Sequence, residues 1–478
     1  MKILFVVSEV APYVKTGGLG EVMNALPKEI HRLGHEIAIF TPLHGKIDRQ
    51  RHPLLSISRS KILRIGRRKI AHRFFASLIS QEVPIYFFDQ PELFGARDQV
   101  YGGEDGNYRY LVFNKAVFSL LETLNWTPDI IHCHDWPAGL IPNYLAQMNR
   151  KSSWKKIKTV FTIHNPAFTG TANAWQIAPE LKDDVESPIP VDPKKLSYLN
   201  FLERGIRFAD VVTTVSELHA KELLAPETDH GLRELLATKK RHFYGIRNGI
   251  DYNLFNPRVD PNLPVNYDVG LLHRKNDNKR ALQHRLGLKI DDKIPLLGMN
   301  TRISEQKGFD LIFEVLPKAL ELGAQFVVVG TGHGAYIETL NAYAKKYPNQ
   351  VAYRPYSEEL GSLVYAGVDL FLMPSRYEPS GLGQMVSLRY GSIPLVRRTG
   401  GLANTITDYN SKTDTGNGFV FDSYTGDELL TTIKRALKVF RSKKRWWELM
   451  RRAMNISYSW ELPAKKYVKA YQLAIKKF

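Results

Sequence analysis

Short apolar runs alternate with amphipathic segments along almost the whole chain. Residues 2–7, 294–299 and 368–373 are such runs, and each is followed by a turn and then by a segment with helical periodicity. Continuous apolar runs of this length are typical of strands that are buried on both faces of a parallel sheet. Because strands and helices alternate in both halves, the pattern predicts an α/β protein with parallel sheets.

The length of the chain indicates more than one domain. A chain of 478 residues exceeds what one hydrophobic core supports, so we expect two domains of about 200 residues each. A turn at Asn248 and Gly249 precedes a stretch rich in proline and asparagine, residues 257–264. We therefore expect domains at residues 1–248 and 249–455, a closing segment at 456–478, and a ligand cleft between the two domains.

The cysteine content and the apolar runs indicate where in the cell the protein is expected. Cys133 is the single cysteine, which excludes internal disulfides and indicates a reducing compartment. No apolar run approaches the ~18 residues of a membrane-spanning helix, and the first run is typical of a strand rather than a signal peptide. The chain is therefore expected to be cytoplasmic, without a membrane partner.

The net charge of +18 makes a polyanion such as nucleic acid a rival partner. Basic residues concentrate at residues 59–69 and 434–452. These clusters lack the interleaved aromatic residues of a single-strand stacking surface. We interpret them as solvated faces, and we expect no nucleic-acid partner.

Two motifs in the second half lie where a parallel sheet binds its ligands. Arg302 and Lys307 follow the run at 294–299, and Glu378 follows the run at 368–373 with Gly381 and Gly383 nearby. Ligands of open α/β sheets bind at the carboxyl ends of the strands, and cations beside a helix N-terminus suit phosphate. A diphosphate site facing one carboxylate predicts an enzyme that uses a nucleotide sugar.

The first half opens with a glycine-rich loop at residues 15–20, between the first strand and a helix expected at 21–33. Neither the dinucleotide fingerprint nor a Walker loop is present. Gly17 and Gly18 let a ligand approach the backbone, where Lys15 can meet an anion. A second polar, aromatic loop at residues 99–110 could line a sugar site or cover the surface.

Two further strands of the first half end in polar residues. Residues 132–135 read His-Cys-His-Asp, and strand alternation places His132 and His134 on one face with Cys133 on the other. No second ligand cluster has zinc-type spacing, so we favour Asp135 as a partner of sugar hydroxyls over a metal site. Proline at 166 ends the next strand, which places His164 at a carboxyl end, in either a structural or a functional role.

Six boxes in order, and a closing motif after them, resemble those of the bacterial glycogen synthases and plant starch synthases, glycosyltransferase family 5. Residues 15–19 resemble its K-x-G-G-L box, 132–136 its H-x-H-D-W box and 162–165 its T-x-H-N box. Residues 302–308, 378–384 and 399–402 match its C-terminal boxes, and 459–461 resemble its closing S-W-E. The resemblance spans the chain.

This resemblance implies a GT-B fold, in which two Rossmann-like parallel-sheet domains face an interdomain cleft and the last helix packs back on the N-terminal domain. It implies retaining transfer of glucose from ADP-glucose to the non-reducing end of an α-1,4-glucan, without a metal or other cofactor. The expected partners are a nucleotide-sugar donor and a glucan acceptor. The location is cytoplasmic, or the plastid stroma in a plastid-bearing source.

The resemblance also distributes roles. Arg302 and Lys307 would neutralise the leaving diphosphate, Glu378 would stabilise the oxocarbenium-like sugar, and His164 would hold the sugar from the N-terminal domain. Asn248 would bind sugar or acceptor, and Tyr356 would stack on the base. The expected substrate-binding residues are Lys15, Gly17, Gly18, Asp135, Asn165, Asn248, Tyr356, Ser380, Gly381, Leu382, Thr399, Gly400 and Gly401.

The sequence departs from the family pattern at three positions. Val386 stands where the wider retaining enzymes often carry a second glutamate, which fits the synthase subgroup. Ser380 and Gly383 stand where bacterial relatives commonly have cysteine and threonine, so donor choice stays open between ADP-glucose and UDP-glucose. The alternatives are a GT-B transferase that makes a small glycoside and, more distantly, a polyanion-binding protein without activity. The sequence does not indicate the oligomeric state.

Overall fold

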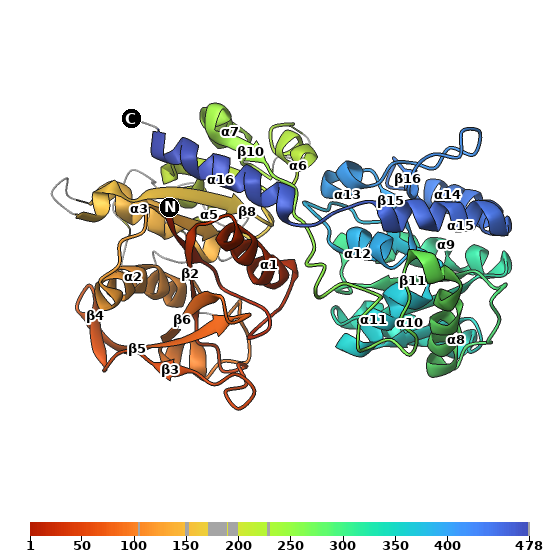
Figure 1. Ribbon diagram of the computed structural model, residues 1–478, viewed down its shortest axis with the longest axis horizontal. Coiled ribbons are helices and arrows are strands. Elements are labelled where there is room, and N and C mark those ends of the chain that lie inside the picture. Colours follow the sequence, from red (N-terminus) through yellow and green to blue (C-terminus); the bar gives the residue numbers. More distant parts are fainter. Residues whose placement is uncertain (104–105, 149–152, 171–188, 190–198, 227–229, 477–478) are drawn as a thin grey trace. The chain divides into compact units, whose positions relative to one another are not determined.

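The structure, a computed structural model, describes residues 1–103, 106–148, 153–170, 189, 199–226 and 230–476. The chain divides into two compact units (Figure 1). The first comprises Met1–Asn248 together with Trp460–Phe478, and the second comprises Gly249–Ser459. The expected closing segment at 456–478 therefore joins the first unit only from Trp460 onward.

In its described residues, the first unit is built on a ten-stranded sheet in the order β10-β9-β8-β7-β1-β2-β6-β5-β3, with β4 paired to β5. Neighbours from β10 to β6 pair in parallel. These parallel strands are β1 (Lys2–Val6), β2 (Glu36–Pro42), β6 (Val83–Asp89), β7 (Ile130–His134), β8 (Lys158–Ile163), β9 (Val211–Thr214) and β10 (Phe243–Gly245).

The edge of this sheet adds antiparallel strands, which the sequence analysis did not predict, to the expected parallel ones. Strands β3 (Leu55–Ser56), β4 (Lys61–Ile65) and β5 (Arg68–Ile79) all pair antiparallel. The basic cluster at 59–69 lies in this edge, where basic residues interrupt the apolar pattern. The loop expected at 99–110 is also partly wrong, because helix α2 (Gly106–Leu124) begins within it. Residues 104 and 105 of that loop lie outside the described residues.

Helices cover both faces of the first sheet. Ile3 and Phe5 of β1 pack on one face with α1 (Gly18–Arg32) and α16 (Glu461–Lys476), which lie side by side. Leu4 and Val6 pack on the other face. That face is covered by α2, α3 (Leu140–Gln147) and α5 (Phe201–Phe208), and the shorter helices α6 (Glu217–Glu222) and α7 (Arg233–Thr238) follow along the chain.

The second unit is a six-stranded parallel sheet in the order β13-β12-β11-β14-β15-β16. Its strands are β11 (Leu296–Asn300), β12 (Gln325–Val329), β13 (Val351–Arg354), β14 (Leu370–Met373), β15 (Ile393–Arg397) and β16 (Phe419–Phe421). Its helices are α8 (Lys275–Leu286), α9 (Phe309–Glu321), α10 (Gly334–Lys346), α11 (Glu358–Gly367), α12 (Gly383–Arg389), α13 (Gly400–Thr405), α14 (Gly426–Phe440) and α15 (Lys443–Asn455). The expected parallel strands of this half are confirmed.

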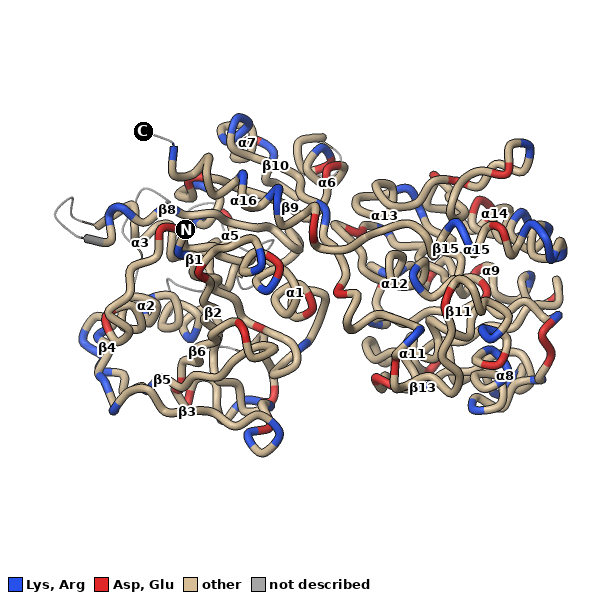
Figure 2. The backbone as a smooth tube through the Cα atoms, in the orientation of Figure 1, with Lys and Arg blue, Asp and Glu red and all other residues tan. Residues whose placement is uncertain are grey.

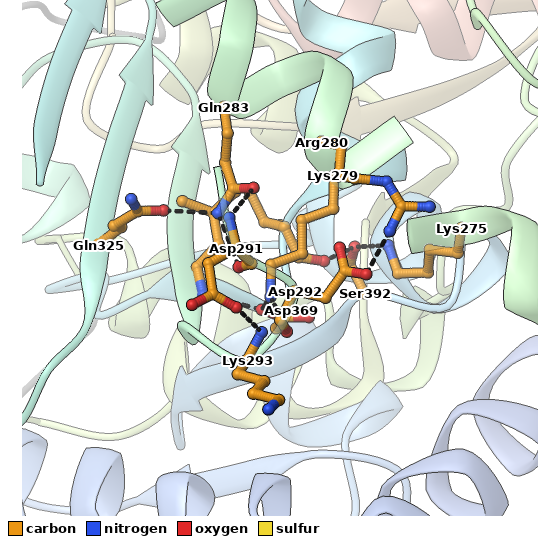
Figure 3. A network of polar contacts seen from close by, with 12 residues as sticks. Lys275, Lys279, Arg280, Gln283, Asp291, Asp292, Lys293, Gln325, Asp369 and Ser392 are labelled. Atoms are coloured by element: carbon orange, nitrogen blue, oxygen red, sulfur yellow. Dashed lines mark hydrogen bonds and ion pairs between the residues drawn. The ribbon is translucent and has the colours of Figure 1, made fainter. Parts of the chain in front are cut away.

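A buried polar network joins α8 to the amino-terminal edge of this second sheet (Figure 3). Lys279 Nζ donates to Asp369 Oδ2 at 2.7 Å, and the backbone N–H of Leu296 donates to the same oxygen at 2.8 Å. Lys275 Nζ donates to the carbonyl oxygen of Ala366 at 2.6 Å and to Ser392 Oγ at 2.8 Å. The network therefore ties one helix to the segments that begin β11, β14 and β15, at the opposite edge from the strand carboxyl ends.

Lysine and arginine positions are spread along the backbone of both units (Figure 2). Residues 57–80, which include β4 and β5, contain no aspartate or glutamate. Among the described residues, no helix combines the length and the hydropathy needed to span a bilayer.

Candidate active site

The second sheet changes winding direction between β11 and β14. From β11 the chain proceeds outward through β12 and β13, then returns to β14 beside β11 and proceeds through β15 to β16. Open α/β sheets bind ligands at such a switch point, outside the carboxyl ends of the strands. The loops that carry Lys307 and Glu378 follow these two neighbouring strands, so the fold brings together the motifs singled out in the sequence.

Lys307 and Glu378 form a buried ion pair at this switch point. Lys307 Nζ lies 2.5 Å from Glu378 Oε2, and the two side chains are 14% and 8% exposed. Ser375 Oγ donates to the same carboxylate oxygen at 3.0 Å. A lysine ammonium has three donors, so Lys307 can hold Glu378 and still offer hydrogen bonds to an anion.

A cavity of about 90 Å³ lies beside this pair. Its walls come from the ends of β11 and β14 and from the loops that follow them, and Lys307 and Glu378 are the two charged residues among its lining. Gly381, Leu382 and Gly383 also line it, at the start of α12.

Arg302, unlike Lys307, is not paired with Glu378 and can bind a ligand. Its side chain is exposed, and within the described residues it makes no hydrogen bond or ion pair. Burial raises the pKa of the neighbouring Tyr377, and the positive charge of Arg302 acts in the opposite direction. Arg302 thus lies near the Glu378 loop with its guanidinium donors open to a ligand.

The glycine pair after β15 allows two loops to touch. A Cβ atom on Gly401 would lie 1.9 Å from the carbonyl oxygen of Ser380, and one on Gly400 would lie 2.1 Å from that of Glu378. The Gly401 N–H donates to the Glu378 carbonyl oxygen at 3.0 Å. The structure therefore gives Gly400 and Gly401 a packing role, in which the first residues of α13 support the backbone of Glu378.

The remaining candidates of this unit lie around the same edge. Ser380 is buried, and Gln384 Nε2 donates to the carbonyl oxygens of Ser380 at 3.1 Å and Gly381 at 3.0 Å, which holds this loop. Tyr356 follows β13, and its ring is 46% exposed. A Cβ atom on Gly361 would lie close to both the Tyr356 ring and the Asn300 amide, so the ring lies near the cavity wall.

The first sheet has its own switch point, between β1 and β7. Glu9 follows β1 and is buried, and its Oε2 accepts from Thr16 Oγ1 at 2.5 Å in the glycine-rich loop. Gly17 is the N-cap of α1 and Gly18 is its first residue, and Lys15 pairs with Glu21 at 2.5 Å in the first turn of that helix. Lys15 therefore lies at the expected edge, with an acidic partner in the helix that follows its loop.

Asp135 directly follows β7 and organises the loop that follows β8. Its Oδ1 accepts the backbone N–H groups of His164 at 2.7 Å and Asn165 at 3.3 Å. Burial raises the pKa of Asp135 to about 7, the two N–H groups oppose this, and Glu9 raises it further. Asn165 Oδ1 accepts the N–H of Ala167 at 3.1 Å, so Asp135 and Asn165 both shape the loop that presents His164.

Asn248 is the residue at which the chain leaves the first unit. Its side chain is buried, and its Oδ1 is an acceptor that no group in the described part of the chain satisfies. A buried unsatisfied amide oxygen costs free energy unless a ligand or water bonds to it. This observation supports the expected ligand-binding role of Asn248.

The sequence interpretation missed three polar residues of these sites. Ser375 and Glu9 each lie just past an apolar strand, a signal that was available in the chain. His134 looked like half of a metal motif, but its Nδ1 lies 2.9 Å from Nε2 of His164. Among the described residues, no group of three or more His, Cys, Asp or Glu side chains is placed to hold a metal ion.

Two family models match the chain. The starch synthase catalytic domain matches residues 2–238, and glycosyl transferases group 1 matches residues 283–451. Glycogen synthase of Geotalea daltonii is 39% identical over 492 residues, covering 100% of this chain and 99% of that relative. Glycogen synthase of Clostridium botulinum strain Alaska E43 is 40% identical over 478 residues, covering 99% of each.

Among solved structures, the catalytic domain of starch synthase IV from Arabidopsis thaliana, bound to ADP and acarbose, matches with a TM-score of 0.90. The identity is 30%, and the match covers 100% of this chain and 99% of that one. These matches confirm the resemblance seen in the six boxes, and they confirm the GT-B fold. The chain belongs to the glycogen synthase family, whose members are glucosyltransferases that extend glucan chains.

Proposed function

We propose that the protein transfers glucose from ADP-glucose to the non-reducing end of an α-1,4-glucan, with retention of configuration. The buried Lys307–Glu378 pair at the switch point, with the open guanidinium of Arg302 nearby, is the observation that carries this proposal. The ADP and acarbose bound to the Arabidopsis protein support an ADP-sugar donor and a glucan acceptor here.

The proposed chemistry separates charge between the diphosphate and the sugar. Negative charge grows on the phosphate oxygen as the glycosidic bond breaks, so Arg302 and Lys307 contribute most in the transition state. Glu378 accepts hydrogen bonds from the glucose and stabilises its oxocarbenium-like centre. Because these two cations supply the positive charge, we propose that neither a metal nor another cofactor is needed.

The other candidates bind and position the substrates. In this proposal, the donor sugar is bound by His164, Asp135 and Asn165. Asn248 contacts the sugar or the acceptor. Tyr356 stacks on the base. The donor phosphates and sugar also meet a set of loop residues, namely Lys15, Gly17, Gly18, Ser380, Gly381, Leu382, Thr399, Gly400 and Gly401. We propose a cytoplasmic location, supported by the single cysteine and by the bacterial relatives.

Glucose incorporation into glycogen primer tests the proposal, with ADP-glucose and UDP-glucose compared side by side and chelator present. We expect strong incorporation from ADP-glucose that the chelator leaves unchanged. Preference for UDP-glucose would overturn the donor assignment but keep the chemistry. Loss of activity with chelator would overturn metal independence, and no incorporation from either donor would favour a small-glycoside transferase.

A further inference from the structure

Three histidines of the first unit lie in a row on one face of its sheet. The rings of His132 and His134, both on β7, have centroids 4.0 Å apart, and both side chains are fully buried. His134 Nδ1 lies 2.9 Å from Nε2 of His164, which is half-buried at the carboxyl end of β8. His132 bonds elsewhere, to Thr162 Oγ1 at 2.6 Å and to the hydroxyl of Tyr471 at 2.9 Å.

All three rings are held neutral. Burial lowers the pKa of His164 to about 3, and it lowers the pKa values of His132 and His134 well below the ordinary value. The nearby carboxyl of Asp135 bonds to the backbone N–H of His164 rather than to its ring. Each neutral imidazole carries one N–H donor and one bare nitrogen, so a single proton lies between His134 and His164.

The unpartnered nitrogen of His134 decides where that proton lies. Its Nε2 is buried and has no hydrogen-bond partner in the described residues. The ring lies nearly parallel to Phe5, at 11°, so an N–H there would not point at the face of that ring. If His164 donated the shared proton, His134 would carry its own proton on Nε2 and strand a buried donor. Stranded buried N–H groups are rarer than unsatisfied acceptors, so His134 donates instead.

We infer that His134 is a positioning residue that fixes His164 as the tautomer protonated at Nδ1. His164 Nε2 is then occupied as an acceptor, and Nδ1–H is the free donor of the ring. Within the described residues Nδ1 makes no hydrogen bond, and it is not among the fully buried unpartnered atoms. His164 therefore presents a neutral N–H donor of fixed direction at the ligand edge of the sheet.

This inference deepens the proposed function and rests on it for the ligand, a sugar hydroxyl that accepts from Nδ1–H. It assigns His164 a binding task and not proton transfer, because a ring that stays neutral keeps the same donor throughout the working pH range. A donor aimed in advance loses less freedom when the substrate binds.

Nuclear magnetic resonance of the full chain with isotope-labelled histidine tests the inference without any substrate. The signals of His164 are identified by their loss in His164→Gln. We expect the free wild-type protein to show His164 neutral and protonated at Nδ1 from pH 5 to pH 8, on the scale of an ordinary histidine titration. A proton on Nε2, or titration of the ring within that range, would overturn the inference.

Paired variants then test whether His134 is the cause. His134→Phe keeps a ring but removes the donor, and we expect the fixed tautomer of His164 to be lost. His134→Asn retains an amide donor near the position of Nδ1 and should restore it. His132→Phe is the matched control, since His132 lies on the same strand and face but its ring nitrogens bond to Tyr471 and Thr162 instead of His164. A tautomer unchanged in His134→Phe, or lost equally in His132→Phe, would contradict the assignment.

Kinetics separate this inference from the proposed function. With ADP-glucose and glycogen, loss of one hydrogen bond predicts a fall of about 3–10-fold in kcat/KM for His134→Phe, with recovery in His134→Asn. A wild-type protein without glucan-synthase activity but with the expected tautomer would refute the proposed function alone. An active enzyme whose His164 is protonated at Nε2 would refute the inference alone.

Discussion

Glu378 shares one carboxylate oxygen between a charged and a neutral donor, Lys307 at 2.5 Å and Ser375 at 3.0 Å. The two donors differ in what their removal costs. A net neutral hydrogen bond contributes about 0.5–1.5 kcal/mol, whereas a bond to a charged group contributes about 1.5–3 kcal/mol. The difference permits a graded test of the site at the scale of single residues.

We predict that Glu378→Gln lowers kcat by at least about 100-fold, because the carboxylate that faces the cationic transition state is lost. Ser375→Ala should lower it by about 10-fold or less, since the carboxylate stays and keeps Lys307. Initial rates of glucose incorporation give both values. Equal losses in the two variants would show that Glu378 acts only by holding its loop.

Arg302→Ala is expected to lower the rate by about 10–100-fold or more, because a charge-assisted contact to the leaving diphosphate is lost. Arg302→Lys keeps the positive charge but lacks the planar pair of donors. Its rate should lie between those of the wild-type protein and Arg302→Ala. Since Arg302 has no partner in the described structure, we expect little change in thermal stability. An unchanged turnover in Arg302→Ala would contradict its assignment.

The residues that could be predicted from the sequence are those whose position along the chain determines their place. Arg302, Lys307 and Glu378 follow strands, and parallel strands bring their carboxyl ends to one edge. The pairing of Lys307 with Glu378 and the contact of His134 with His164 depend on packing between distant segments. Spacing carries no information about such contacts, so the sequence predicted neither.

At the scale of elements, the close contact between the loop after β15 and the Glu378 loop leaves no space for a side chain. Gly401→Ala would place Cβ 1.9 Å from the Ser380 carbonyl oxygen, so the Glu378 loop must shift. We predict a loss of stability of about 1–3 kcal/mol and a loss of activity. Gly334→Ala is the control, because it begins α10 with nothing within 4 Å of a Cβ atom. Equal melting temperatures in the two variants would refute the packing role.

Helix α8 carries a pH-dependent contribution to stability. Burial lowers the pKa of Lys275 to about 7, Asp369 opposes this, and Lys279 lowers it further. An unfolded lysine titrates near pH 10.4. Between these values the unfolded state binds more protons, so the free energy of unfolding rises with pH, by at most about 1.4 kcal/mol per unit.

Denaturant unfolding measures the contribution of Lys275 to stability. The wild-type protein and Lys275→Met are compared at about pH 6 to 9, a range chosen around the lowered pKa of Lys275. We predict that the stability of the wild-type protein relative to the variant rises with pH above about 7. A constant difference across the window would show that Lys275 keeps its ordinary pKa in the folded protein.

Strands β11 to β15 of the second unit were predicted well because they are buried on both faces and therefore read as apolar runs. The short strand β16 was not predicted. The antiparallel strands β4 and β5 were missed because exposed arginines and lysines alternate with their buried residues. The start of helix α2, Gly106 to Tyr110, was predicted as part of a loop because it is polar and aromatic. The local pattern of apolar residues therefore does not predict a strand or helix reliably where one of its faces is exposed to solvent.

At the scale of the whole molecule, the chain leaves the first unit at Asn248 and returns to it at Trp460. The returning segment contributes Trp460, Tyr467 and Tyr471 to the core beneath β1 and α1. The hydroxyl of Tyr471 also bonds to His132 on β7. The last helix is therefore part of the first unit's core, although the whole second unit separates the two along the chain.

We predict that deletion of residues 460–478 destabilises the first unit selectively, by about 5 kcal/mol or more for three lost aromatic side chains. Hydrogen exchange should show lost protection in β7 to β9 and unchanged protection in β11 to β14. Tyr471→Phe is the milder variant, and it should cost about 1 kcal/mol. Uniform loss across both units, or no loss in the first, would contradict this division.

The most direct test of the whole account is product analysis with ADP-glucose and a short α-1,4-linked oligosaccharide acceptor. The account predicts that the wild-type protein produces a ladder of longer chains with α-1,4 linkages only, and that Glu378→Gln produces none. A single added glucose, a β-linked product or a full ladder from Glu378→Gln would contradict a retaining, chain-extending transferase built on the Lys307–Glu378 site.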